Sequence, residues 1–445
     1  MIVSPEGMND LLPDMAFFWN SFRSKALETF GRYGYLPIDT PIVEQTALFV
    51  RSIGMGTDVV SKEMFAAISG ENLRRWVEEG KSPKAKSLLS LRPEGTAGIV
   101  RAVVQHDLVP RGAAPAKLVY AGPMFRAERP QKDRYRQFNQ LGIECLGSDS
   151  PTIDAEAISM LMDFFGQIGL PYDSFKLLIN SIGCESCRST YREALRSFLL
   201  ENSASLCETC NTRIELNPLR TLDCKNADCQ NVMHVAPKIT NYLCNECKCH
   251  FDEVKELLCV SSIPYIEEPS LVRGLDYYTR TVFEVQVAEG MGAQNAIGGG
   301  GRYDRLAEQI EGRRTPGFGF ALGFERVVSA LSSIGIEPHV TRSLDVFVAC
   351  ACAEAYKVAF SLAQACRAKG LSADFDHQGR SLKSQLKLAN KFNALQVIFL
   401  GPDELDGNYV TVRDMENHEE RPISMESVVV ELVAALTKKS ESGPA

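Results

Sequence analysis

Apolar residues at helical spacing open the chain and predict its first element. Between 18 and 30 they recur every three or four positions, and Gly31 interrupts the pattern, which is typical of a long amphipathic helix. The following run 35–45 has the composition of a strand but contains a central proline, which favours a sheet edge or an interface. The polar stretch 59–88 predicts a loop or hairpin at the surface.

The middle of the chain alternates between strand-like and helix-like patterns. Residues 118–147 predict two strands joined by a charged loop, and a helix at 154–169 and a strand at 175–180 follow. A further helix is predicted at about 189–200. Residues 271–287 predict a strand pair, which leads into a glycine-rich strand and another helix.

A new pattern begins at about residue 344. Strands there alternate with helices at 354–369 and 382–390, and a strand is predicted at 396–400, which favours a small α/β domain with a parallel or mixed sheet. The second of these helices has a basic face, which is either a phosphate-contacting stripe or an ordinary solvated face. The face is formed by Arg380, Lys383, Lys387 and Lys391.

Composition narrows the class of protein. The 445 residues include 45% hydrophobic and 23% charged side chains, which suits a globular chain of two or three domains. The net charge of -8 argues against nucleic-acid binding through a uniformly basic surface but leaves local patches open. We expect no secretory signal and no membrane span, and therefore a cytoplasmic protein with reduced thiols.

Nine of the fourteen cysteines lie between 184 and 249. Several form C-x-x-C pairs, the spacing with which thiolates hold structural Zn²⁺. Two pairs about thirty residues apart predict a zinc ribbon whose ligands would be Cys207, Cys210, Cys244 and Cys247. All eight paired cysteines together could hold two ions. The alternatives are buried thiols or a decayed metal site. An iron–sulfur cluster is disfavoured because no C-x2-C-x2-C run is present.

Charged and polar residues at strand spacing predict a polar cleft. Arg126 and Glu128 stand two apart and would share one strand face. Gln140 and Glu144 stand four apart and would do the same. The alternative for this stretch is a surface ion-pair ladder. GGGG at 298–301 lacks the pattern of a phosphate-binding loop, so we expect close backbone approach to a ligand there.

Several blocks together resemble a known family. LRPEGT at 91–96, FRAERPQKDRYRQFNQLGIE at 125–144 and LVRGLDYYTRTVFE at 271–284 are similar to motifs of the histidyl-tRNA synthetases. GFGFALGFER, which ends at Arg326, resembles the third motif of the class II aminoacyl-tRNA synthetases. The resemblance extends over essentially the whole chain.

The resemblance implies an α+β fold. Its catalytic core is a six-stranded antiparallel sheet flanked by helices, and it is homodimeric through the first motif, which is the opening helix with the strand that ends at Pro41. It carries a cysteine-rich insertion domain and a C-terminal α/β anticodon-binding domain. The implied boundaries are 1–180 and 261–338 for the core, 181–260 for the insertion, 344–438 for the anticodon-binding domain and 439–445 for a flexible tail.

The implied reaction is the ligation of L-histidine to its tRNA through a histidyl-adenylate, with ATP and Mg²⁺. Arg126 and Arg273 would act on the α-phosphate and Arg326 on the γ-phosphate, because charge stabilisation dominates such chemistry. The histidine-binding residues would be Glu94, Thr96, Arg126, Gln140, Glu144, Arg273, Tyr277, Tyr278 and Tyr303. The ATP-binding residues would be Arg126, Glu128, Arg134, Phe138 and Arg326.

Within that site, the residue types suggest specific tasks. A buried ammonium requires a carboxylate and a hydroxyl, which Glu94 and Thr96 could supply from one strand face. A neutral imidazole has one donor and one acceptor, so Glu144 could accept from its N–H while Tyr278 donates. Adenine would stack between Phe138 and Arg326.

Two other classes of protein share some of these features. Catalytically silent paralogues of the family are regulatory subunits of ATP phosphoribosyltransferase, and they lack the anticodon-binding domain and parts of the histidine motifs. A zinc-ribbon nucleic-acid binder on an unrelated scaffold would share only the cysteines. The presence of all the motifs favours the synthetase.

Overall fold

The computed structural model describes residues 1–54, 57–82, 84, 87–222, 224, 226–287, 295–337 and 343–441. The chain divides into two compact units, Met1–His339 and Val340–Ala445, and each is described by itself. The α+β class is confirmed. Of the tail predicted at 439–445, residues 442–445 lie outside the described part, while 439–441 belong to a helix.

The first unit is built on an eight-stranded sheet of order β1-β5-β6-β11-β10-β9-β7-β8. The six central strands pair antiparallel, while the two-residue strands at the edges pair parallel. The sheet implied by the resemblance is therefore present, with two short edges added. Its strands are β1 (Leu36–Pro37), β5 (Ala116–Phe125), β6 (Gln137–Leu146), β7 (Phe175–Ser181), β8 (Ile266–Glu267), β9 (Thr279–Val287), β10 (Ala296–Arg302) and β11 (Gly317–Gly323).

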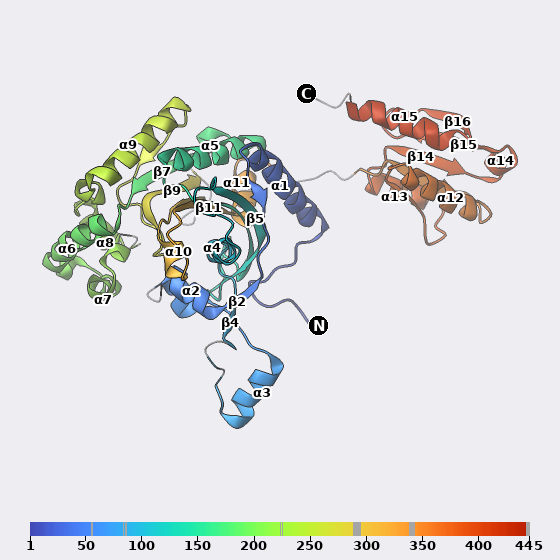
Figure 1. Cartoon of the computed structure of the whole chain (residues 1–445). Coiled ribbons are helices and arrows are strands. Elements are labelled where there is room, and N and C mark those ends of the chain that lie inside the picture. Colours follow the sequence, from blue (N-terminus) through green and yellow to red (C-terminus); the bar gives the residue numbers. More distant parts are fainter. Residues whose placement is uncertain are drawn as a thin grey trace. The chain divides into compact units, whose positions relative to one another are not determined.

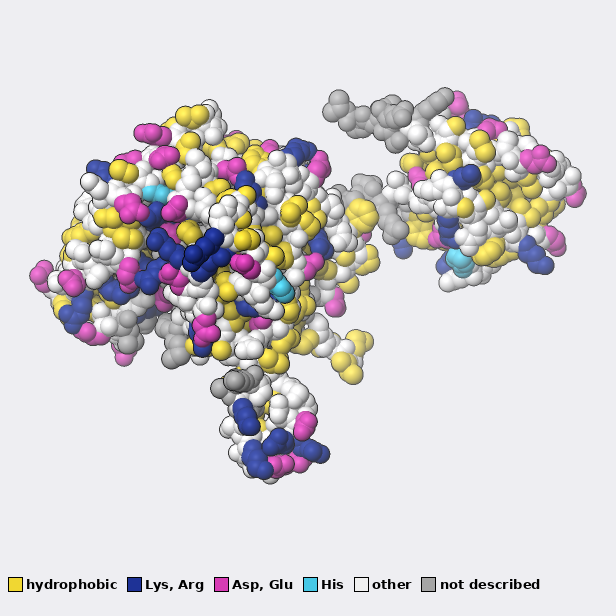
Figure 2. Space-filling view, in the orientation of Figure 1, with side chains coloured by type: hydrophobic (Ala, Val, Ile, Leu, Met, Phe, Trp, Pro, Cys, Tyr) yellow, Lys and Arg dark blue, Asp and Glu magenta, His cyan; other side chains and the backbone are white. Residues whose placement is uncertain are grey.

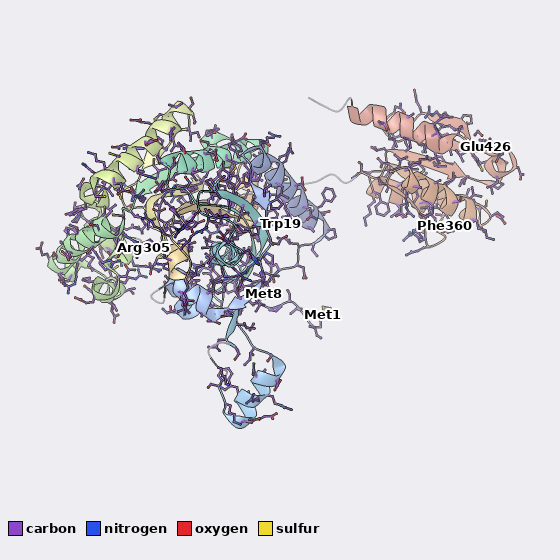
Figure 3. The ribbon with its side chains drawn as sticks, viewed as in Figure 1. Met1, Met8, Trp19, Arg305, Phe360 and Glu426 are labelled. Carbon is purple, nitrogen blue, oxygen red and sulfur yellow. The ribbon has the colours of Figure 1, made fainter. Side chains whose placement is uncertain are left out.

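Helices cover both faces of this sheet. Figure 1 shows α1, α5 and α9 over its convex side and α4 end-on within its curve. The main apolar cluster lies between the sheet and α1, α5, α9 and α11. Trp19 of α1, labelled in Figure 3, packs edge-on against Phe324 with ring centroids 4.7 Å apart. These helices are α1 (Pro13–Arg32), α4 (Thr96–Gln105), α5 (Pro151–Gln167), α9 (Asn245–Val260), α10 (Leu306–Gln309) and α11 (Phe324–Ser333).

A smaller sheet of order β2-β4-β3 stands beside the main one. It consists of β2 (Val43–Gln45), β3 (Ala66–Ala67) and β4 (Leu89–Leu91), and α2 (Thr46–Ile53) and a short π-helix at Val59–Glu63 accompany it. The stretch 59–88, predicted as a loop or hairpin, also contains α3 (Gly70–Glu79), none of whose residues is buried. This helix projects from the unit (Figure 1), and basic and acidic side chains lie together on it (Figure 2).

The cysteine-rich stretch is helical. It contains α6 (Glu185–Glu201), α7 (Glu208–Leu216) and α8 (Ala227–His234), joined by short 3-10 turns, and it returns to the sheet through α9. A small apolar cluster of its own holds these helices together. A helical module in this position replaces the ribbon that the cysteine spacing suggested.

The second unit has a mixed five-stranded sheet of order β13-β12-β14-β15-β16, as the alternating pattern predicted. Helices α12 and α15 pack on one face and α13 on the other. Its strands are β12 (Val346–Cys350), β13 (Ala373–Phe375), β14 (Gln396–Leu400), β15 (Tyr409–Asp414) and β16 (Glu420–Ser424). Its helices are α12 (Ala355–Ala368), α13 (Leu382–Lys391), α14 (Pro402–Asp406) and α15 (Val428–Glu441). Among the described residues of the whole chain, no helix is long and apolar enough to span a membrane.

Candidate active site

A pocket of about 220 Å³ lies in the first unit, against strands β6, β9, β10 and β11. Its walls come from segments far apart in the sequence, including the turn before α4, the β5–β6 loop, residues 271–278 and the start of α11. Most of the predicted site residues meet here. Those that line the pocket are Glu94, Thr96, Arg126, Glu128, Arg134, Phe138, Gln140, Arg273, Tyr277, Tyr278 and Arg326.

Arg126 and Glu128 face the pocket from a loop rather than a strand. Strand β5 ends at Phe125, so the strand alternation assumed for this pair is wrong, although both side chains reach the same cavity. The Nε of Arg126 donates to the carbonyl of Pro93 at 3.1 Å, and its guanidinium lies 5.2 Å from the centre of the Phe138 ring. Glu128 is paired with Arg134.

Glu94 caps a helix, which corrects the prediction that it shares a strand face with Thr96. Strand β4 ends at Leu91, and α4 begins at Thr96. The two carboxylate oxygens of Glu94 accept from the backbone N–H of Thr96 at 2.7 Å and of Ala97 at 2.9 Å. Burial raises the pKa of Glu94, against these hydrogen bonds. The capping holds the carboxylate in the pocket wall at a helix N-terminus.

The segment 271–278 is irregular, so the predicted strand pair reduces to β9 alone. Without strand alternation, Tyr277 and Tyr278 both line the pocket, with ring centroids 4.6 Å apart. The Nη1 of Arg273 donates to Glu284 Oε2 at 2.9 Å. The acidic partner of Arg273 therefore comes from strand β9.

Glycine makes room for Arg273 on the neighbouring strand. A Cβ at Gly299, on β10, would lie 2.6 Å from Arg273 Nη1 and 2.7 Å from the carbonyl of Phe283. At Gly299 the strand backbone thus comes close to a pocket side chain; the approach to a ligand expected for the run 298–301 stays a prediction.

Glu144 and Tyr303 lie behind the pocket wall and are absent from its lining. Glu144 accepts from the Thr96 hydroxyl at 2.6 Å and from the Tyr303 hydroxyl. Burial raises the pKa of Glu144 to about 8 in spite of these bonds. Gly319 lines the pocket opposite Glu144 in the β6–β11 ladder, and a Cβ there would lie 1.9 Å from Glu144 Oε2. Because Gly319 has no side chain, the carboxyl group of Glu144 fits directly behind the pocket wall at this position.

Gln140 and Arg326 complete the pocket. Gln140 Oε1 is buried and has no hydrogen-bond partner among the described residues. The Nη1 of Arg326 donates to the carbonyl of Ala296 at 2.9 Å, and its Nε donates to that of Asp133 at 3.3 Å. Arg326 and Phe138, between which adenine was predicted to stack, both line this cavity. The guanidinium that lies over the Phe138 ring is that of Arg126.

Some lining residues were missed by the sequence reasoning. Glu284 and Glu325 lay inside the recognised motifs but were assigned no task. Glu325 accepts from the backbone N–H of Asn139 at 2.9 Å and thereby ties α11 to β6. Tyr120 and Asp133 also line the pocket. Asp133 lies inside the recognised block 125–144 as well, whereas only the three-dimensional arrangement could have indicated Tyr120.

Comparisons with known proteins agree with this geometry. The histidyl-tRNA synthetase family model matches residues 7–327, and an anticodon binding domain matches residues 345–435. A histidine–tRNA ligase from Halothermothrix orenii is 42% identical over 97% of this chain and 99% of its own. One from Moorella thermoacetica is 44% identical over 96% of each chain.

This chain belongs to the histidyl-tRNA synthetase family. The crystal structure of apo S. aureus histidyl-tRNA synthetase shares its fold with a TM-score of 0.79, at 34% identity over 97% of this chain and 100% of that one. The chain is accordingly a class II aminoacyl-tRNA synthetase that charges tRNA with histidine for protein synthesis, as the motifs implied.

The cysteines of this synthetase gather differently from the predicted set. Cys207, Cys210, Cys244 and Cys247 do not form one group, because each pair belongs to a different cluster. One cluster is Cys184, Cys187, Cys244 and Cys247, and the other is Cys207, Cys210, Cys224 and Cys229. All fourteen cysteines are free of disulfides. Spacing identified the pairs, but only the helical fold determines how they combine.

The predicted basic stripe of the synthetase lies on α13 and the turn before it. Lys383, Lys387 and Lys391 are exposed, while Arg380 is held by Asp376 at 2.6 Å. The opposite side of α13 packs on the sheet through Leu382, Leu386 and Ala389. The three lysines remain available to a ligand, whereas Arg380 is engaged within the unit.

Proposed function

We propose that this pocket binds histidine and ATP together and forms histidyl-adenylate, after which a ribose hydroxyl at the tRNA 3′ end takes the histidyl group. The observation that carries the proposal is the convergence of Arg126, Arg273 and Arg326 on one cavity that also holds the buried carboxylate of Glu94. Three cations match a triphosphate, and a buried carboxylate matches an ammonium.

The cations would work on the phosphates. The histidine carboxylate attacks the α-phosphorus, a bond to pyrophosphate breaks, and negative charge builds on the phosphorus oxygens. Arg126 and Arg273 would stabilise that charge at the α-phosphate, and Arg326 would bind the γ-phosphate. The ion pair of Arg273 with Glu284 fixes its guanidinium before the substrate arrives, which limits reorganisation in the transition state.

Mg²⁺ would accompany ATP and neutralise part of the phosphate charge. Carboxylate oxygens are the ligands that Mg²⁺ takes in proteins, and Glu284 and Glu325 offer such oxygens in the pocket lining. These two residues would hold the ion.

Histidine would be recognised by a ring of hydrogen-bonding groups. Glu94, Thr96 and Gln140 would bind its ammonium, and the unpartnered Gln140 Oε1 supports this. Glu144 would accept an imidazole N–H beside Gly319, while Tyr278 donates to the other ring nitrogen and Tyr277 packs against it. Tyr303 would fix Glu144 from behind. A substrate without the second nitrogen would leave a buried group unpaired, which costs about 1–3 kcal/mol.

ATP would lie along the β5–β6 side of the pocket. We propose that adenine stacks on Phe138 with Arg326 on its other face, that Glu128 accepts from its amino group, and that Arg134 reaches the phosphates. Glu128 and Arg134 are paired with each other without ligand, so this pair would open when ATP binds.

Histidine-dependent exchange of pyrophosphate into ATP tests the adenylation step. We expect exchange that requires L-histidine and is absent with other amino acids. Folded protein that charges no tRNA and supports no exchange would contradict the proposal and favour a regulatory paralogue.

We also propose that residues 344–438 bind the tRNA anticodon arm, with phosphate contacts from Lys383, Lys387 and Lys391. Replacing the three lysines by alanine should weaken tRNA binding and reduce the slope of log K against log salt by up to about 0.7–0.9 for each lysine that contacts a phosphate. Histidine-dependent exchange should not change. Lys357, on α12 of the same unit, supplies a matched single-charge control.

Assembly and location complete the proposal. We propose a cytoplasmic homodimer, as suits an enzyme of protein synthesis, with an interface along the first motif. Exposed apolar side chains support this interface: Phe17 (46% exposed), Leu36 (66%) and Val43 (39%). Sedimentation at micromolar concentration should give twice the chain mass.

We further propose that 1–180 and 261–338 form the catalytic core and that the insertion at 181–260 binds structural zinc. Two groups of four cysteines whose sulfurs lie within 4.8 Å of one another support zinc, because tetrahedral thiolate sites are typical of structural zinc.

A further inference from the structure

The two cysteine clusters have the dimensions of metal sites. We call Cys184, Cys187, Cys244 and Cys247 the inner cluster, and Cys207, Cys210, Cys224 and Cys229 the outer cluster. The Sγ atoms of Cys184 and Cys187 lie 3.6 Å apart, and those of Cys207 and Cys224 lie 3.9 Å apart. A tetrahedron of sulfurs about 2.3 Å from Zn²⁺ has edges of about 3.8 Å. Disulfides would need about 2.05 Å.

Helix N-termini contribute cysteines to both clusters. Cys184, Cys207 and Cys244 stand at helix N-caps, and the second cysteine of each of these pairs lies in the first turn of its helix. Backbone donors point at the sulfurs as well. Cys187 Sγ accepts from the N–H of Cys244 at 3.1 Å, and Cys229 Sγ accepts from that of Cys207 at 3.2 Å.

The inner cluster joins the entry and exit of the insertion. Cys184 and Cys187 follow β7, and Cys244 and Cys247 begin α9, which leads back to the sheet. Gly183, with φ of +66°, makes the turn into the cluster, and a Cβ there would lie 2.5 Å from Cys187 Cβ. An ion in the inner cluster would therefore close the base of the whole module.

An arginine beside each cluster supports the irregular segment 271–278. Arg188 directly follows Cys187, and its Nη1 donates to the carbonyl of Tyr278 at 3.1 Å. Arg220 lies four residues before Cys224, and its Nη2 donates to the carbonyl of Gly274 at 2.8 Å. These two bonds reach the segment that carries Arg273, Tyr277 and Tyr278 from outside the pocket.

We propose that the insertion binds two zinc ions, one in each cluster, and that the ions brace segment 271–278 through Arg188 and Arg220. Neither the metal content nor the bracing contacts depend on the proposed function; only the consequence of the bracing for adenylation rests on it. The ions touch no reacting atom. Arg305, at the start of α10 and labelled in Figure 3, adds a further contact to the module: its Nη1 lies 3.7 Å from Glu185 Oε2.

Metal analysis of the purified full-length chain tests the two sites. We expect two zinc ions per chain in the wild type and one in each double variant, Cys187→Ser/Cys247→Ser and Cys210→Ser/Cys229→Ser. Cys249→Ser is the matched control, because Cys249 is exposed and belongs to neither cluster; it should keep two. One ion or none in the wild type, or iron in place of zinc, would overturn the proposal.

A second measurement tests the bracing without disturbing the ligands. In Arg188→Ala and Arg220→Ala, which keep all eight cysteines, amide hydrogen exchange in 271–278 should become about tenfold faster. Arg196→Ala is the control, because Arg196 pairs with Glu215 within the insertion. Unchanged exchange in both variants would overturn the bracing.

Cobalt substitution separates these outcomes from misfolding and from catalytic failure. Tetrahedral cobalt thiolates absorb visible light, and we expect twice the absorbance in the wild type as in either double variant. A double variant that fails to fold leaves the wild-type zinc and cobalt measurements decisive. Protein with two zinc ions and a protected segment 271–278 but no pyrophosphate exchange would refute the proposed function and leave this inference intact.

Discussion

The pocket and the insertion lie in one unit but are held in place by different means. The pocket side chains stand on a sheet backed by the largest apolar cluster of the unit, with rings such as Phe164, Phe283 and Phe318 fully buried. The insertion has a separate cluster of nine buried residues, and two of these are Cys210 and Cys229 of the outer cluster. A module with so small a core usually needs disulfides or metal to be stable.

The difference also concerns buried charge. Near the sheet, Arg302 and Asp154 are fully buried and paired at 2.5 Å, and His250 of α9 lies 2.9 Å from the same carboxylate. Such pairs need a rigid frame, because their desolvation is costly unless geometry is maintained. His250 is the contribution of the insertion to this network; the part of the insertion that precedes it has the two cysteine clusters instead. We infer that the sheet positions the side chains of the pocket, and that the insertion stabilises the pocket from outside through its contacts with segment 271–278.

Of the changes proposed here, removal of the Arg273 side chain from the pocket should have the largest effect on activity. Arg273→Ala should lower the rate of histidyl-adenylate formation by about 10²–10³-fold, far more than it weakens histidine binding, because its charge matters most in the transition state. Single-turnover kinetics with histidine and ATP measure both quantities. An equal loss in Arg196→Ala, on the insertion surface, would mean that the insertion contributes as much as the pocket.

A methyl group at Gly319 should be the next most disruptive change. Gly319→Ala places a Cβ 1.9 Å from Glu144 Oε2 and 2.5 Å from the carbonyl of Ile143, so we expect a loss of about 1–3 kcal/mol in the free energy of unfolding. Gly166→Ala, in α5, meets nothing within 4 Å and should be neutral or stabilising by up to about 1 kcal/mol. Urea denaturation of both variants measures the difference, and equal midpoints would contradict it.

The contrast between these regions also determines what sequence could predict. The alternation of apolar and polar residues predicted strands β5, β6 and β14 at nearly their observed positions, because a regular strand has a side-chain period of two. The same alternation misplaced Glu94, which caps a helix, and segment 271–278, which is irregular and so turns both Tyr277 and Tyr278 to one cavity. The partners of each cysteine pair depend on how four helices fold together, and spacing along the chain does not contain that information.

The pH dependence of stability should reveal the buried Glu144. Its pKa is raised to about 8 by burial, so between about pH 4.5 and 8 the unfolded chain loses a proton that the folded chain keeps. The stabilisation that Glu144 contributes is therefore fully present below about pH 4.5. Within the range it falls as the pH rises, by at most about 1.4 kcal/mol in the free energy of unfolding per pH unit. In Glu144→Gln this contribution should vanish, so the difference between wild type and variant should slope with pH. Urea midpoints from pH 5 to 9 measure it, and parallel profiles would rule out a neutral Glu144.

The smallest effect should come from one hydrogen bond in the insertion core. The buried Tyr191 hydroxyl donates to the carbonyl of Pro237 at 2.9 Å, so Tyr191→Phe should destabilise the insertion by about 0.5–1.5 kcal/mol. Limited proteolysis within 188–243 should become faster, while pyrophosphate exchange stays near the wild-type rate because both cysteine clusters remain. Tyr172→Phe, whose residue is 45% exposed outside the insertion, is the control and should change neither. Global unfolding of Tyr191→Phe, with loss of the pocket, would show that insertion and sheet form one cooperative structure instead of a frame and its support.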